Sequence, residues 1–377
     1  MRVTGGNVFS GGAFVEAAVE IADGRIAALA PSQAASAAEG DIDATGCYVV
    51  PGFIDIHFHG CVGADLCDAT GEALRAIARH EASRGVTAIC PATMTYPEEL
   101  LTSVARTAAA FEPAADEAAL VGINMEGPFI SPDKIGAQNP AYVQRADAAM
   151  LRRIQKEAGG LVKLVDIAPE EPGALEFTTE VADEVRVSLA HTCTDYDTAR
   201  AAFERGARHM THLYNAMPGL HHRKPGPIAA AWEAPEATVE LICDGVHVHP
   251  AMARLTFALF GAERICLISD SMRACGLEDG TYDLGGQDVT VRGNVATLAD
   301  GTIAGSVTDL AACVRHAVRE MGVPLEDAVL AATLTPARAI GIDAERGSLE
   351  AGKVADMLVL DEDLNVKHVV LRGEQIK

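Results

Sequence analysis

The sequence has few basic residues for its acidic content. It contains 30 Lys and Arg against 53 Asp and Glu, which gives a formal net charge of −23 and a pI near 4.8. Phosphate backbones and anionic lipid surfaces attract basic proteins, so we expect neither nucleic acid nor a membrane as a partner. A small anionic substrate is compatible with this charge, because a local basic pocket can outweigh a distant, screened field.

The chain also lacks a long apolar segment and a Cys-x-x-Cys pair. No apolar run approaches the length that crosses a bilayer, and residues 1–6 contain no apolar signal region. Nine cysteines, an odd number, are scattered over 377 residues, which favours reduced thiols in a cytoplasm over a disulfide framework. The composition, 49% hydrophobic and 22% charged, is that of a globular protein with ample material for a core.

Apolar runs of strand length alternate with helical stretches through the middle of the chain. The runs begin near Val49, Val86, Leu120, Leu161, Val187, Ala207, Val239 and Ile265. Eight strand-then-helix units predict a (β/α)₈ barrel, although the helices after the third and sixth strands are weakly patterned. An open doubly wound sheet is the alternative, which the number of strands alone does not dismiss.

Both ends of the chain show the pattern of short strands. Near the N-terminus an Asp23-Gly24 turn joins two of them, and strands of the same type recur within residues 354–373. We therefore predict a small β domain formed from residues 1–50 and 343–377, and a barrel formed from residues 51–342.

Residues with metal-binding or acid–base side chains follow six of the predicted barrel strands. His57 and His59 end the first strand, and because alternate side chains of a strand share a face, they form a half-site for a divalent transition metal. The other strand ends contribute Glu126, His191, His212, the pair Asp244 and His247, and Asp270. A barrel brings the C-terminal ends of its strands to one mouth, where active sites lie. Any one of these residues alone is more often structural, but together they predict an active site.

These stretches resemble the amidohydrolase superfamily and, within it, the family of N-acetylglucosamine-6-phosphate deacetylases. The resemblance covers nearly the whole chain and is clearest in Pro51–Gly60, Asn124–Phe129, Ala190–Thr192, Thr211–Pro218, Asp244–His247 and Ser269–Ser271. Asn-Met-Glu-Gly-Pro and His-Leu-Tyr-Asn-Ala-Met-Pro are the specific signature of the deacetylases. The resemblance implies a metal-dependent (β/α)₈ barrel that carries a small β-sandwich built from both termini.

The candidate metal ligands fit hydrolytic chemistry. Glu126, His191 and His212 supply one carboxylate and two imidazoles, which leaves a position open for water, and the family's tight site uses these three positions. His57 and His59 can hold a second ion with Glu126 bridging, so the set accommodates one or two ions. The ligand types favour Zn²⁺, and Fe²⁺, Mn²⁺ or Co²⁺ suit the same atoms.

Asp270 is the candidate proton shuttle, and it matches the family's catalytic aspartate. A carboxylate beside the metal can accept a proton from water and later protonate the leaving amine. The structural alternative is that Asp270 caps the following loop or helix.

Substrate contacts follow from the resemblance. It implies that His247 contacts the phosphate ester or the polarised amide, that the backbone of Asn215 and Ala216 lies near the phosphate, and that Arg223 reaches the phosphate from the neighbouring subunit of a homodimer. A guanidinium binds phosphate bidentately, which supports this role. Gln138 stands where some members carry histidine; it can hydrogen-bond a sugar hydroxyl but cannot become cationic, which leaves the hexosamine epimer open.

We therefore expect an enzyme that hydrolyses N-acetyl-D-glucosamine 6-phosphate to D-glucosamine 6-phosphate and acetate in amino-sugar catabolism. The alternatives within the class are a deacetylase of the galactosamine epimer and another amidohydrolase acting on an N-acyl or cyclic amide. A barrel that binds a sugar phosphate as a sensor is the non-enzymatic alternative, against which the complete ligand set and Asp270 argue.

Overall fold

All eight predicted barrel strands form in the computed structural model, which describes residues 1–31 and 40–377. They are β7 (Phe53–Asp55), β10 (Val86–Ile89), β12 (Ile123–Phe129), β13 (Val162–Ile167), β14 (Arg186–Leu189), β15 (His209–Met210), β16 (Thr238–Ile242) and β17 (Ile265–Ile268). Neighbouring strands from β12 to β17 pair in parallel, as do β7 and β10. Such strands are buried on both faces, so nearly all of their side chains are apolar. This explains the continuous apolar runs in the sequence.

Backbone hydrogen bonds close these strands into a barrel. Between β10 and β12, the Asn124 N–H donates to the Pro91 carbonyl at 3.0 Å and the Thr93 N–H to the Asn124 carbonyl at 2.8 Å. Between β17 and β7, the Asp270 N–H donates to the His57 carbonyl at 2.9 Å. The (β/α)₈ barrel is therefore confirmed, and the open doubly wound sheet is excluded.

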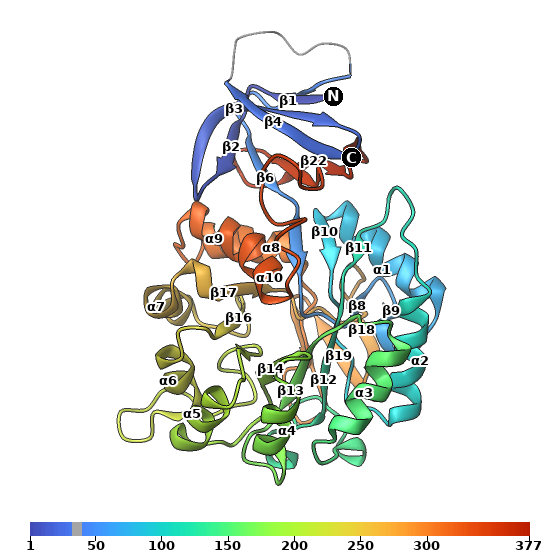
Figure 1. Cartoon of the computed structure of the whole chain (residues 1–377), viewed down its shortest axis with the longest axis vertical. Coiled ribbons are helices and arrows are strands. Elements are labelled where there is room, and N and C mark those ends of the chain that lie inside the picture. The colour runs from blue at the N-terminus through green and yellow to red at the C-terminus, as the bar shows by residue number, and fades with distance from the viewer. Residues whose placement is uncertain (32–39) are drawn as a thin grey trace.

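A helix follows each strand and covers the outside of the barrel (Figure 1). These helices are α1 (Gly71–Ser83), α2 (Glu98–Ala109), α3 (Ala148–Glu157), α4 (Ala174–Val181), α5 (Tyr196–Glu204), α6 (Gly226–Glu233), α7 (Pro250–Phe260) and α8 (Leu310–Arg319). The weakly patterned helices α3 and α6 both form; the Asp147 side chain caps α3, and Pro225 precedes α6. Two further helices, α9 (Leu325–Ala332) and α10 (Leu334–Ala339), lie against β17, and Ala337 packs on the barrel's inner core.

Strands from both ends of the chain form one sheet beside the barrel, where Figure 1 also places the two termini. Its described strands are β1 (Arg2–Thr4), β2 (Asn7–Ser10), β3 (Ala13–Ala22), β4 (Arg25–Pro31), β5 (Ile42–Asp43), β6 (Tyr48–Pro51), β21 (Met357–Leu360), β22 (Val366–Leu371) and β23 (Glu374–Gln375). The N-terminal and C-terminal parts join where β6 pairs antiparallel with β21, so that Val50 lies opposite Leu358. This sheet has an apolar core of its own, which includes Val19, Val49 and Met357.

Gly52 separates two strands of different sheets within the apolar run that begins near Val49. Before it, β6 belongs to the terminal sheet; after it, β7 belongs to the barrel. The Gly52 N–H donates to the Asp356 carbonyl at 3.0 Å, and the Phe53 N–H donates to the Gly85 carbonyl at 3.1 Å. The hydrogen-bond partners of the run therefore change at Gly52, from the terminal sheet to the barrel.

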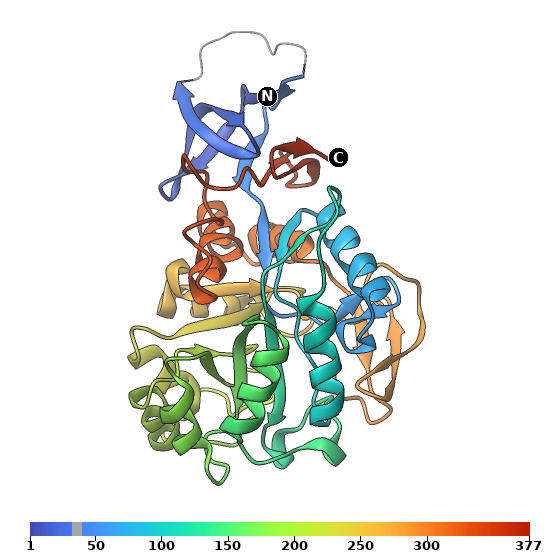
Figure 2. The ribbon, with the colours of Figure 1, turned by 45° about the vertical axis from the view of Figure 1, so that its right-hand side comes forward.

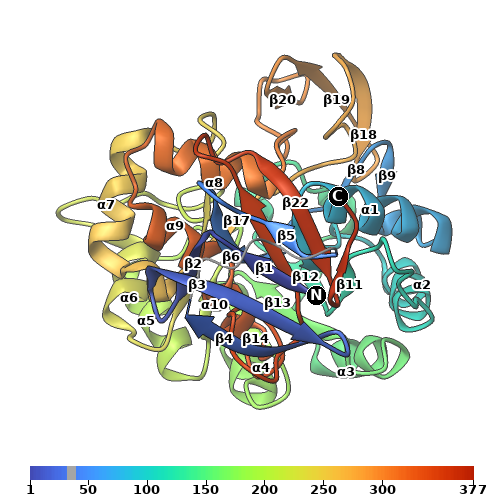
Figure 3. The same ribbon diagram turned by 90° about the horizontal axis from the view of Figure 1, so that it is seen from above.

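A three-stranded antiparallel sheet, absent from the sequence prediction, is inserted in the chain between β17 and α8 and lies at the edge of the molecule (Figures 2 and 3). It consists of β18 (Gly280–Leu284), β19 (Gln287–Arg292) and β20 (Val295–Thr297). Leu284 and Val289 pack in one apolar cluster with Met94 and Met272, which anchors this sheet to the barrel mouth.

The remaining described elements are short. They are β8 (Gly60–Cys61), β9 (Ala64–Asp65), β11 (Ala119–Leu120), and the 3₁₀ helices η1 (Leu66–Asp68), η2 (Pro132–Lys134), η3 (Pro140–Tyr142) and η4 (Ala262–Arg264). Among residues 1–31 and 40–377, no helix combines the length and apolar character that a bilayer span requires. All nine cysteines are free thiols.

We predict that Gly52→Ala destabilises the protein by about 1–3 kcal/mol, as overpacking does. A Cβ at Gly52 would lie 2.1 Å from Oγ1 and 2.3 Å from Cγ2 of Thr87, which is closer than non-bonded atoms approach one another. The urea midpoint should fall without a change in the slope of the transition. Gly71→Ala is the control, because its Cβ would meet nothing within 4 Å. Equal midpoints for the two variants would contradict the packing argument.

Candidate active site

The predicted site residues converge on a cavity of about 610 Å³ at the C-terminal mouth of the barrel. Residues from seven segments line it, namely His59, Glu126, Gln138, His191, His212, Asn215, Ala216, His247 and Asp270. His57 is fully buried directly behind this wall. The rest of the lining consists of Met94, Leu284, residues 133–137 and residues from the 300–305 segment, which follows β20.

Glu126, His191 and His212 form the first ligand group. Their donor atoms face one another: Glu126 Oε1 lies 2.9 Å from His191 Nε2 and 3.1 Å from His212 Nε2, and the two nitrogens are 3.2 Å apart. The His191 Nδ1–H donates to the Lys134 carbonyl at 2.9 Å, which leaves the Nε2 lone pair of the neutral ring directed at Glu126. Facing lone pairs repel unless a cation lies between them, so this donor set fits a divalent metal.

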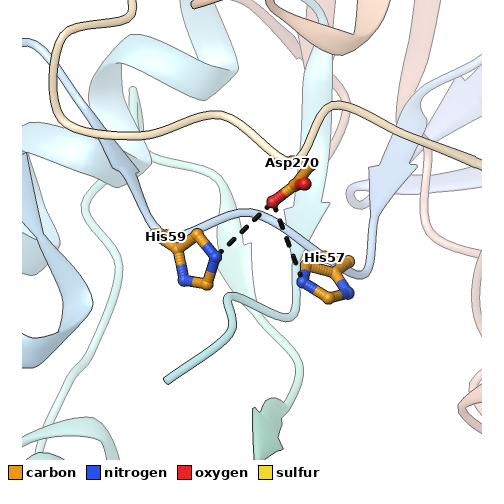
Figure 4. A group of neighbouring side chains, drawn as sticks. All are labelled: His57, His59 and Asp270. Carbon is orange, nitrogen blue, oxygen red and sulfur yellow. Dashed lines mark ion pairs between the residues drawn. The ribbon is translucent and has the colours of Figure 1, made fainter. Parts of the chain in front are cut away.

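His57, His59 and Asp270 form the second group (Figure 4). Asp270 Oδ1 lies 3.5 Å from His59 Nε2 and 3.9 Å from His57 Nε2. Glu126 adjoins this group too, with Oε1 3.7 Å from His57 Nε2 and Oε2 3.3 Å from His59 Nε2. The buried His57 Nε2 has no hydrogen-bond partner among the described residues, as expected of an atom that faces a cation site.

Charge pairing dominates the electrostatics of this centre. Burial alone would raise the pKa of Glu126, but the charge on His57 and the close approach of the His191 and His212 rings hold it well below its ordinary value. Burial likewise opposes ionisation of Asp270, and the hydrogen bond from His59 nevertheless keeps its pKa low. The carboxylates on Glu240 and Glu126 raise the pKa of His57 despite its burial. Both carboxylates are therefore anionic and attract a cation into the mouth.

Glu240, which sequence reasoning missed, orients two of the candidate ligands from behind. Fully buried in β16, its carboxylate accepts the His57 Nδ1–H at 2.9 Å and the backbone N–H of His212 at 3.0 Å. Its other oxygen accepts the His209 Nε2–H at 3.0 Å, and His209 Nδ1 lies 2.6 Å from Thr238 Oγ1. The available signal was a lone glutamate inside an apolar strand, Thr-Val-Glu-Leu-Ile.

The backbone is strained where strands end at the mouth. Positive φ angles occur at His191 (42°), His212 (27°), Tyr214 (78°), Ala216 (50°) and Asp270 (50°). Non-glycine residues rarely adopt such angles, and they persist only where surrounding contacts enforce them. This conformation turns the chain sharply out of each strand and directs the functional groups into the cavity.

Gln138 and His247 occupy different parts of the lining. Gln138 is 3% exposed, and both polar atoms of its amide are engaged: Oε1 accepts the Thr95 N–H at 2.6 Å, and Nε2 donates to Glu126 Oε2 at 2.7 Å. It therefore positions the Glu126 carboxylate. The His247 Nδ1–H donates to Asp244 Oδ2 at 2.7 Å. Burial opposes its protonation, but this bond and the Asp244 charge raise the pKa of His247.

Arg223 and Lys134 are placed differently with respect to the cavity. Arg223 lies on an exposed loop, where its Nη1 is 2.7 Å from His222 Nε2, and it is not part of the cavity lining of its own chain. Lys134, which sequence reasoning did not select, does line the cavity. Its place directly after the strand-end motif of β12 was the available signal.

Taken together, a closed (β/α)₈ barrel whose mouth gathers histidines and carboxylates defines a metal-dependent hydrolase. The amidohydrolase family model matches residues 48–376, and the chain belongs to that family.

Two curated relatives resemble this chain to nearly the same degree. The N-acetylglucosamine-6-phosphate deacetylase of Bacillus subtilis (strain 168) is 38% identical over 94% of this chain and 91% of its own. The N-acetylgalactosamine-6-phosphate deacetylase of Escherichia coli O157:H7 is 37% identical over 94% and 93%. Among solved structures, a mutant N-acetyl-D-glucosamine-6-phosphate deacetylase from Mycobacterium smegmatis, in complex with N-acetyl-D-glucosamine-6-phosphate, superposes with a TM-score of 0.93 at 35% identity and covers 100% of this chain and 98% of that one.

We predict that Glu240→Gln weakens metal binding about 10- to 100-fold, the usual effect of losing a carboxylate that orients a metal-ligating histidine. An amide cannot accept from His57, His209 and the His212 backbone together as the carboxylate does. Bound metal should be measured against a competing chelator, with circular dichroism to confirm folding. Glu236→Gln, at an exposed position nearby, is the matched control. Unchanged affinity in a folded Glu240→Gln protein would rule out the orienting role.

Proposed function

We propose that this enzyme removes the acetyl group from N-acetyl-D-glucosamine 6-phosphate, producing D-glucosamine 6-phosphate and acetate in amino-sugar catabolism. The observation that carries this proposal is the convergence of Glu126, His191, His212 and Asp270 in one cavity, in a chain whose relatives are named for this reaction. The nine free cysteines support a cytoplasmic location as part of the proposal.

The metal ligands and Asp270 divide the chemistry between them. A divalent metal, when bound, polarises the acetyl carbonyl and lowers the pKa of a water toward about 7. Glu126, His191 and His212 would hold it, and His57 and His59 would hold a second ion; we propose Zn²⁺, and Fe²⁺, Mn²⁺ or Co²⁺ suit the same donors. Asp270, anionic and 7% exposed at the cavity wall, accepts the proton of the attacking water and transfers it to the leaving amine.

Cationic groups around the cavity suit the phosphate. The raised pKa of His247 favours its imidazolium form, which binds an anion or a polarised amide. Lys134 and the backbone of Asn215 and Ala216 line the same space, and a cavity of about 610 Å³ lies in the range of small-molecule sites. We further propose that Arg223 completes the phosphate site of a neighbouring subunit in a homodimer.

The galactosamine epimer is the second candidate substrate. The Escherichia coli relative named for that epimer is about as similar to this chain as the Bacillus subtilis relative named for the glucosamine epimer. Gln138 Oε1 and Nε2 each make one hydrogen bond inside the protein, so Thr95 and Glu126 fix the orientation in which the amide can meet a sugar hydroxyl. Rates of acetate release from the two 6-phosphates, measured with one metal at a time, distinguish the substrates.

We predict that Asp270→Asn retains metal and substrate binding while turnover falls by at least about 10²-fold, the usual range for a lost general base. Asparagine has nearly the same shape but cannot accept the proton. Acetate release, metal content and substrate binding should be measured on the same preparation. Near-normal turnover would assign Asp270 to a capping role, and binding without turnover in the wild type would favour the sensor.

We predict that Arg223→Ala raises the KM for the 6-phosphate about ten- to hundredfold, the effect of losing a charge-assisted contact, and leaves metal content unchanged. Lys224→Ala is the control, because Lys224 is the adjacent exposed cation.

A mixing experiment tests whether Arg223 acts across the dimer. Subunits carrying Arg223→Ala are combined with subunits carrying Asp270→Asn, each weak alone. In a dimer completed by the neighbouring subunit, one site of each mixed pair contains both native residues, so activity should partly recover. Mixed dimers without recovery would place Arg223 outside the neighbouring site.

A further inference from the structure

A second cluster of metal-ligating side chains lies outside the catalytic cavity. Cys61 belongs to β8, and His80 and Glu81 belong to the C-terminal part of α1. One ligand atom from each, a sulfur, a ring nitrogen and a carboxylate oxygen, lies within 4.8 Å of the other two. Cys61 and Glu81 are buried, at 0% and 1% exposure, and His80 is partly exposed. None of the three residues is part of the cavity lining.

Three buried nitrogen and oxygen atoms of this cluster lack partners within the described part of the chain. Among the described residues, neither carboxylate oxygen of Glu81 nor Nε2 of His80 has a hydrogen-bond partner. Arg84, the cation whose charge acts on Glu81, pairs instead with Asp309 at 3.1 Å. A buried carboxylate without a partner is strongly unfavourable, so most such groups are paired or bind a metal.

Protonation alone does not satisfy Glu81. Burial raises the pKa of Glu81 well above its ordinary value, and the charges on Asp55 and Asp309 add to this effect. The group within hydrogen-bonding reach is the Cys61 thiol, which is a weak donor and a weak acceptor and so compensates the buried acid poorly. A cation that binds both groups satisfies the carboxylate and the sulfur together.

The surrounding backbone holds the three side chains together. The loop after Asp270 packs on the hairpin of Cys61: the Val62 N–H donates to the Cys275 carbonyl at 2.8 Å, and the Gly63 N–H donates to the Arg273 carbonyl at 2.7 Å. At Gly276, where φ is 81°, a Cβ would lie 2.9 Å from Cε1 of His80, so glycine leaves room for the imidazole ring.

We propose that Cys61, His80 and Glu81 form a structural Zn²⁺ site, separate from the catalytic metal centre. A thiolate, an imidazole and a carboxylate are ordinary zinc ligands, and the soft thiolate disfavours magnesium and calcium. One thiolate and one carboxylate neutralise a divalent ion, which suits a buried position. Cys275, buried in the adjoining loop, is a candidate fourth ligand.

The ion would brace the backbone that supports two catalytic-site residues. The N–H groups of His59 and Gly60 both donate to the Ser271 carbonyl, at 2.7 and 3.2 Å. Cys61 directly follows His59 and Gly60, and Ser271 directly follows Asp270. Tying Cys61 to α1 therefore limits the movement of the loops that present His59 and Asp270.

Cobalt provides a test that separates the two sites. The full-length protein is stripped with a chelator and reconstituted with Co²⁺, and near-ultraviolet absorption is recorded. A thiolate ligand produces a sulfur-to-cobalt charge-transfer band, and the catalytic donors are nitrogen and oxygen atoms only. We expect the band in the wild type and in His191→Ala, and its loss in Cys61→Ser. Cys47→Ser is the control, because Cys47 is a buried cysteine of the terminal sheet. Absence of the band in the wild type, or its persistence in Cys61→Ser, would overturn the proposal.

Zinc titration gives an independent measurement. Glu81→Gln, which keeps the side-chain volume, should bind one Zn²⁺ fewer than the wild type. Zinc should also raise the thermal midpoint of this variant by less than it raises that of the wild type. If Glu81→Gln does not fold, His80→Ala, at a partly exposed position, replaces it in both measurements. Zinc content and midpoint shift equal to those of the wild type would identify Glu81 as a neutral buried acid.

Discussion

A buried carboxylate at the centre of the barrel mouth imposes the condition that the surrounding structure meets. Glu126 is 2% exposed and yet anionic, so positive charge and hydrogen-bond donors must surround it. Histidines from three strand ends direct nitrogens at its two oxygens, and the Gln138 amide donates to one of them. The same condition makes the mouth a cation site, because facing nitrogen and oxygen lone pairs are stable together only around a cation.

Rigid support makes this arrangement possible. Glu240 holds the His57 ring and the His212 backbone from below, and the barrel closes through the hydrogen bond between Asp270 and His57. Positive φ angles at His191, His212 and Asp270 persist because these contacts fix the backbone conformation. The cavity walls, in contrast, come from long loops and from the sheet of β18, β19 and β20, the parts in which a barrel varies without disturbing its core.

Several features of the fold and the site could be predicted from the sequence, and others could not. The eight barrel strands appear as apolar runs, and the residues that line the cavity stand at their ends. The sheet of β18 to β20 was missed, although Gly285-Gly286 and Gly293-Asn294 are hairpin-type turns, because the strands beside them are short and half exposed. Gln138 was interpreted from its place in a motif, and its contact with Glu126 is not visible there. The change of sheet at Gly52 is not visible in the apolar run from Val49, because burial on both sides of Gly52 is alike.

The sequence by itself determined the class of fold and the chemical groups available at the mouth. Periodicity, strand length and residue type are local properties, and the C-terminal ends of barrel strands meet wherever the chain closes. Only the tertiary structure decided which atoms meet: Glu240 reaches His57 across 183 positions of the chain, Gln138 is committed to Glu126, and Cys61 lies beside Glu81. Such contacts join residues of different elements, and they depend on ångström-scale packing that no local pattern encodes.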